Sequence, residues 1–145
     1  MTLSILDINK RNNEKQLRKT IWAYLILSVV AVVVDKIYGI FGHGVHSAAM
    51  TWMFLYPLLG GALFYFIIQR LIKHITKFAG YWVFLNIHNS GIATLTLASL
   101  LKGIFEIADT NSPYLVYYYM TGGVFIAAGL IIMLIMALNQ DRVHV

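Results

Sequence analysis

The sequence predicts an all-α integral membrane protein whose four transmembrane helices form an up-down-up-down bundle, and three observations predict it. Of the 145 residues, 59% are hydrophobic and 12% are charged, with a mean hydropathy of +0.72, whereas about a quarter of the residues in soluble domains are charged. The apolar residues gather in four segments long enough to cross a bilayer, and most basic residues flank these segments. A chain of this length forms one domain, residues 1–145, which begins with a short polar segment at 1–19.

The four predicted spans follow from segment length. A transmembrane helix needs roughly 20 predominantly apolar residues, and residues 20–38, 48–68, 79–101 and 114–138 meet this requirement. No small-residue cleavage pattern follows the first segment, so we expect a retained span rather than a signal peptide. The fourth span is uncharged, and the preceding Ser112-Pro113 is typical of a helix start. The connections are short, which makes consecutive spans antiparallel neighbours.

The basic residues predict that both termini lie in the cytoplasm. Nine of the eleven Lys and Arg residues fall before the first span, between the second and third spans, or after the fourth, and only Lys36 and Lys102 fall elsewhere. Cytoplasmic connections carry an excess of Lys and Arg, while Trp and Tyr collect at headgroup level at both surfaces. Aromatic residues lie at the predicted inner ends of spans one and three in agreement with this orientation: Trp22, Tyr24, Tyr81 and Trp82.

Small residues in spans three and four predict a helix–helix seam. Ser90, Thr94 and Ala98 form one row at i, i+4 spacing in span three, and Gly123 and Ala127 form another in span four. Association of helices in lipid depends on close backbone approach, which small residues permit. We therefore expect these two rows to face each other, within one chain or between two chains.

Span two contains a predicted kink. Pro57 lies near its middle and is followed by Gly60 and Gly61. A proline inside a helix removes one backbone hydrogen bond and clashes with the carbonyl of the residue four positions earlier, here Met53. The kink would be either a hinge that borders a ligand cavity or a static bend, which is common in membrane helices.

A polar patch inside span three is the first candidate site. Asn86, His88, Asn89 and Ser90 lie close together in the sequence, and His88 is expected about 12–14 Å above the inner end of the helix at a rise of 1.5 Å per residue. Polar groups at this depth usually face a protein interior or a wet cavity. The patch would hold a haem, relay protons or contact a substrate; alternatively, it only makes hydrogen bonds between helices.

The predicted outer connections carry a possible metal site. His43 and His46 lie three residues apart in a glycine-rich connection, and Glu106 and Asp109 have the same spacing in the other outer connection. Two imidazoles and two carboxylates suit zinc or a similar divalent ion if the connections meet. The alternative is a set of solvated side chains, with Lys102 and Glu106 paired on one helix face.

A basic stretch between spans two and three is the third candidate. Arg70, Lys73, His74 and Lys77 follow i, i+3, i+4, i+7 spacing, which places them on one face of a helix. Such a face binds anionic lipid headgroups. The same charges also act as a topology signal, which is the simpler interpretation.

These features leave three classes of function. The first is a transport or membrane-complex accessory protein that acts by helix association around the buried polar patch. The second is a haem- or metal-binding redox protein, and the third is a small membrane-embedded enzyme. No phosphate-binding loop, nucleophile elbow or HExxH motif is present, and the chain lacks cysteine, so the first class is favoured and a non-enzyme is expected.

The composition also limits the kinds of partner that we expect. The net charge of +5 comes from the flanks of the spans, so it indicates membrane topology and not binding of nucleic acid. We expect the lipid bilayer and either a second copy of the chain or another membrane protein as partners. The sequence does not specify a cofactor.

Reporter fusions test the predicted topology. Fusions after Ile8, Lys73 and Arg142 should give a cytoplasmic signal, and fusions at Gly42 and Thr110 should give an external one. An external signal at Lys73 would contradict the four-span topology, because most basic residues would then lie on the wrong side.

Overall fold

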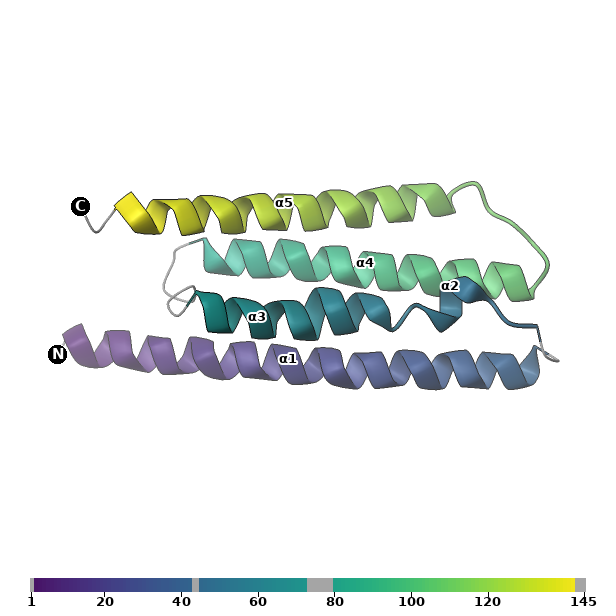
Figure 1. The fold of residues 1–145 in the computed structure, drawn as a ribbon, viewed down its shortest axis with the longest axis horizontal. Helices are drawn as coiled ribbons and strands as arrows, with labels where there is room; N and C mark the ends of the chain where they lie inside the picture. The colour runs from purple at the N-terminus through teal and green to yellow at the C-terminus, as the bar shows by residue number, and fades with distance from the viewer. Residues whose placement is uncertain (1, 43–44, 73–79, 143–145) are drawn as a thin grey trace.

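The computed structural model describes residues 2–42, 45–72 and 80–142, and its regular structure over these residues is helical throughout (Figure 1). The four helices long and apolar enough to span a membrane within this part of the chain are Glu14–Phe41, Ala48–Leu71, Tyr81–Ile107 and Leu115–Asn139. The predicted all-α membrane fold with four spanning helices is therefore confirmed. In chain order the elements are α1 (Thr2–Phe41), α2 (Ala48–Thr51), the π-helix η1 (Tyr56–Leu63), α3 (Phe64–Leu71), α4 (Tyr81–Ile107) and α5 (Leu115–Arg142).

Helix α1 is much longer than the span predicted at residues 20–38. It has 40 residues, which corresponds to about 60 Å at 1.5 Å per residue, twice the roughly 30 Å of a hydrocarbon core. The polar segment continues the helix because residues 2–19 contain neither glycine nor proline to stop it. Part of α1 therefore extends beyond the membrane at the N-terminal end.

The spans lie side by side in chain order. Figure 1 shows α1, the column formed by α2, η1 and α3, then α4, and finally α5, with the chain reversing direction from each column to the next. The two ends of the described chain lie at the same end of the molecule, which we call the terminal end; the other we call the distal end. Helix α5 packs extensively against α4 and makes only marginal contacts with the other helices.

Span two is interrupted before Pro57. The amides of Met53, Leu55 and Tyr56 bond to carbonyls three residues earlier at 3.1–3.3 Å, and the π-helix η1 begins at Tyr56. Because Pro57 has no N–H and its ring disfavours regular α-helix, the carbonyl of Met53 accepts from Tyr56 instead. The predicted bend at Pro57 stays a prediction, since the observed feature is a change of winding that starts before the proline.

Glycines bring α4 and α5 close together. On α5, Leu115, Gly122, Gly129 and Met136 are buried at intervals of seven residues, the repeat that a coiled-coil seam uses. A Cβ atom added to Gly91 would lie 2.6 Å from the Ile126 side chain and 3.0 Å from the Gly122 carbonyl oxygen. The backbones of the two helices are thus in near contact at this point.

The two predicted small-residue rows do not face each other within one chain, and a contact between them in two chains stays a prediction. A Cβ added to Gly123 has nothing within 4 Å, and Ser90 and Ala127 are exposed. The contact uses Gly91 and Gly122 instead, each one position from a predicted residue. One residue corresponds to about 100° around a helix, so the true seam lies on an adjacent face of both helices.

Candidate functional site

The buried polar residues of α4 meet span two at His88. This side chain is only 2% exposed, and its Nε2 lies 3.0 Å from the carbonyl oxygen of Gly60 in the π-helix. The Phe64 ring stacks on the imidazole at a centroid distance of 4.3 Å, and the rings of Tyr65 and Phe84 approach to 5.6 and 5.7 Å. Aromatic rings therefore enclose His88.

The contact with Gly60 determines where the imidazole of His88 carries its proton. A carbonyl oxygen can only accept, so Nε2 donates the hydrogen bond. In the neutral tautomer Nδ1 is then a bare acceptor, and it is buried without a partner among the described residues. The arrangement suits a neutral imidazole that joins α4 to span two.

Asn89 connects three spans through one oxygen atom. Its Oδ1 accepts hydrogen bonds from the hydroxyls of Tyr24 on α1, at 2.7 Å, and Tyr65 on α3, at 2.6 Å. The two tyrosine rings stack on each other with centroids 6.0 Å apart. We call Tyr24, Tyr65, His88 and Asn89 the polar core, because these side chains join α1, α3 and α4 inside the membrane-spanning region.

Gly61 makes room for this arrangement. A Cβ atom at Gly61 would lie 2.4 Å from the ring of Tyr24, which is closer than real Cβ contacts allow. The neighbouring Gly60 faces Ile92 at an ordinary 3.4 Å. The absence of a side chain at Gly61 therefore lets the Tyr24 ring reach Asn89.

The predicted polar patch is divided between two faces of α4. His88 and Asn89 belong to the polar core, whereas Asn86 and Ser90 are exposed. The Ser90 hydroxyl donates to the carbonyl of Asn86 in its own helix at 2.9 Å. Hydrogen bonding of this kind lets a serine lie on an apolar face without an interhelical partner.

Sequence reasoning missed the two tyrosines of the polar core. Tyr24 was assigned to the headgroup belt, but it is 9% exposed and hydrogen-bonded inside the protein. Tyr81, assigned to the same belt, is also buried, whereas Trp22 and Trp82 are exposed as expected. Ser28 lies one turn from Tyr24 and is also buried; this i, i+4 pair was a signal of an internal face of α1, because small polar residues are enriched at helix–helix contacts in membranes.

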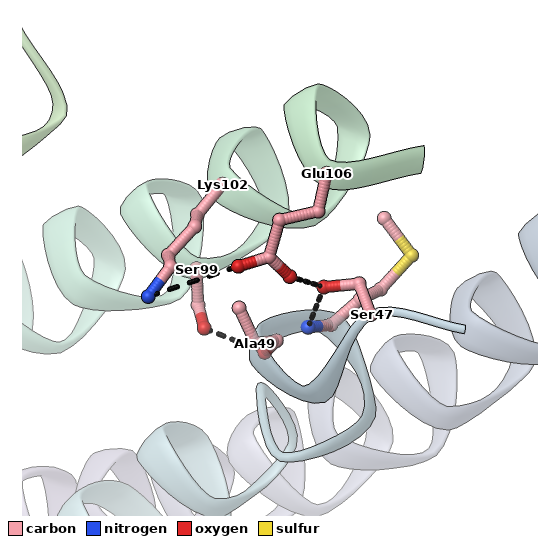
Figure 2. Close-up of polar contacts among 6 residues, drawn as sticks. Ser47, Ala49, Ser99, Lys102 and Glu106 are labelled. Atoms are coloured by element: carbon pink, nitrogen blue, oxygen red, sulfur yellow. Dashed lines mark hydrogen bonds and ion pairs between the residues drawn. The ribbon is translucent and has the colours of Figure 1, made fainter. Parts of the chain in front are cut away.

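A second set of polar contacts joins α2 to α4 at the distal end. Figure 2 shows the Ser47 hydroxyl donating to the Glu106 carboxylate, whose other oxygen lies 3.8 Å from the Lys102 ammonium. The Ser99 hydroxyl donates to the Ala49 carbonyl at 2.7 Å. Ser47 also accepts from the Met50 amide and so caps α2. These contacts fix the start of span two against α4.

The proposed metal ligands are not brought together within the described part of the chain. No group of three or more His, Asp or Glu side chains that could hold a metal ion occurs among residues 2–42, 45–72 and 80–142. Glu106 binds Ser47 and Lys102 instead, while Asp109 occupies a turn at φ 51°. His43 lies outside the described residues, so the four-residue site with His46 stays a prediction.

The basic stretch is described only in part. Arg70 is exposed at the end of α3, with its guanidinium 5.3 Å from the centre of the Phe66 ring. Lys73, His74 and Lys77 lie outside the described residues. Binding of lipid headgroups by Arg70, Lys73 and Lys77 stays a prediction.

Comparison with protein-family models, curated proteins and solved structures gave no match. The class of protein is therefore assigned from the sequence and structure of this chain. Its four apolar helices define a small polytopic integral membrane protein. Within that class, the polar core and the distal contacts are the features from which a function can be argued.

Two adjacent glycines provide a test of the polar core. Gly61→Ala should displace the Tyr24 ring and lower stability by about 1–3 kcal/mol, the usual cost of overpacking. Gly60→Ala is the matched control and should leave stability unchanged or slightly higher, because alanine favours helix. Thermal unfolding in mild detergent measures both, and equal stabilities for the two variants would contradict the placement of Tyr24.

Proposed function

We propose that this protein is a non-catalytic accessory subunit of a membrane complex, in which its helices form a rigid scaffold around the buried polar core. The observation that carries this proposal is the double hydrogen bond to Asn89. One amide oxygen accepts from Tyr24 on α1 and Tyr65 on α3, so polar groups that could contact a solute are used to hold helices together. Interhelical hydrogen bonds of this type stabilise membrane bundles by about 1 kcal/mol each.

The surface grooves also favour a scaffold over a carrier that works alone. One groove of about 240 Å³ lies between α1 and the start of α4, and another of about 240 Å³ is lined by apolar residues of η1, α4 and α5. Neither is lined by His88 or Asn89. A site for a transported solute in a membrane protein normally combines a cavity with buried polar residues, and these two grooves lie apart from the polar core.

The surroundings of His88 do not suit a haem. An axial ligand needs a free imidazole nitrogen that faces the iron, but Nε2 bonds to the Gly60 carbonyl and Nδ1 is enclosed. The Phe64 ring, stacked at 4.3 Å, occupies one face of the imidazole. This geometry supports a structural role for His88 and disfavours the redox alternative.

The open face of α5 supports association with another helix. Helix α5 packs mainly on α4, and its other faces are exposed. Gly123 and Ala127 lie on one exposed face at i, i+4 spacing, and a Cβ placed at Gly123 would meet no described side chain or neighbouring helix within 4 Å. Since small residues allow close backbone approach in lipid, we infer that a helix of a second copy or of a partner membrane protein packs here.

Native mass in mild detergent tests this association. Wild-type protein extracted from its own membrane should exceed the 16.4 kDa of one chain. Gly123→Leu should reduce the mass to that of one chain with unchanged melting temperature, because position 123 is exposed and a Cβ there would point into open space. Thr121→Leu is the matched control, since Thr121 is exposed and lies about 160° around the helix. A monomeric wild type, or a Gly123→Leu variant that keeps the full mass, would contradict the proposal.

His88→Leu separates a scaffold from an active site. The scaffold role predicts a loss of about 1 kcal/mol, one interhelical hydrogen bond, with the native mass retained. Thermal unfolding, native mass and the absorption spectrum should be measured on the same preparation. Loss of a Soret band or of solute flux from reconstituted vesicles, in a variant that still folds, would overturn the proposal.

A further inference from the structure

A groove at the start of α4 is separate from the polar core and from the open face of α5. Its volume is about 240 Å³, below the roughly 300–1,000 Å³ of sites that enclose a whole drug-sized ligand. It therefore fits part of a larger molecule, such as a headgroup. Two helix faces form its walls, one on α1 and one on the first turns of α4: Gln16, Lys19, Thr20, Tyr81, Trp82 and Leu85.

The groove carries one positive charge, at Lys19, and hydrogen-bond donors on both of its walls. Lys19 is exposed and forms no ion pair with a described residue. Helix α4 starts at Tyr81 with no side-chain cap and no acidic residue in its first turn, so neither its cap residue nor its first turn offsets the positive end of its dipole. These features favour an anion.

The Tyr81 hydroxyl gives an independent indication of a ligand. Tyr81 is 2% exposed, it lines the groove, and its hydroxyl has no hydrogen-bond partner among the described residues. A buried polar group without a partner costs about 1–3 kcal/mol. An acceptor atom of a bound molecule would remove this cost.

The remaining walls are apolar and belong to the first turns of a membrane-spanning helix. Trp82 is 44% exposed, as expected of a tryptophan at headgroup level, and Leu85 lies one turn further along α4. An acyl chain can therefore lie along Trp82 and Leu85 while a charged group stays near Lys19. We propose that this groove binds one anionic phospholipid, with its phosphate between Lys19 and the start of α4.

Lipid-dependent stability tests the site. Phosphatidylglycerol added to the full chain in neutral detergent should raise the melting temperature, and phosphatidylcholine should raise it less. Lys19→Gln should abolish most of the difference between the two lipids. Arg18→Gln is the matched control, because Arg18 is exposed, lies about 100° around α1 from Lys19 and does not line the groove. This variant should keep the difference in melting temperature between the two lipids.

A second variant tests the hydroxyl. Tyr81→Phe should leave the melting temperature without lipid unchanged or higher, because its hydroxyl has no partner to lose. It should also reduce the shift caused by phosphatidylglycerol. The proposal is overturned if phosphatidylcholine stabilises as much as phosphatidylglycerol, if Arg18→Gln and Lys19→Gln lose the shift equally, or if Tyr81→Phe keeps the full shift.

Discussion

The hydrogen bonds to the Asn89 side-chain oxygen determine how the spans are positioned. Lipid offers no partner to a buried polar group, so an asparagine within a span must be satisfied by its own chain or by a neighbour. Here one oxygen accepts from Tyr24 and Tyr65 and thereby joins α1, α3 and α4. This hydrogen bonding also requires a glycine at position 61, since a side chain there would displace the Tyr24 ring that reaches Asn89.

The winding of span two follows from Pro57. Pro57 lacks an N–H, the helix before it is interrupted, and the chain continues as a π-helix through Gly60. The Gly60 carbonyl accepts a hydrogen bond from His88, so a local consequence of proline is linked to packing between helices. π-Helices are rare and often occur at functional sites.

The sequence predicted the spans well and the helix faces poorly, for a physical reason. Hydropathy is summed over about 20 residues, so four spans could be recognised despite local irregularities. The face of each residue depends on helix rotation, and one position changes it by about 100°. Asn86 was predicted to be part of a buried patch with His88 but is exposed, and the contact between α4 and α5 uses Gly122, the neighbour of the predicted Gly123. The role of Tyr24 depended on a partner 65 residues away, which spacing alone does not indicate.

The coupling between Tyr24 and Asn89 tests the central claim most directly. Stability should be measured in a bilayer or mild detergent for the wild type, Tyr24→Phe, Asn89→Leu and the double variant, which together form a double-mutant cycle. We expect a coupling free energy of about 0.6 kcal/mol and no more than about 1.7 kcal/mol, the average and the maximum of measured interhelical hydrogen bonds in membranes. A coupling of zero would mean that the two side chains do not interact, and the polar core would then not hold α1 against α4.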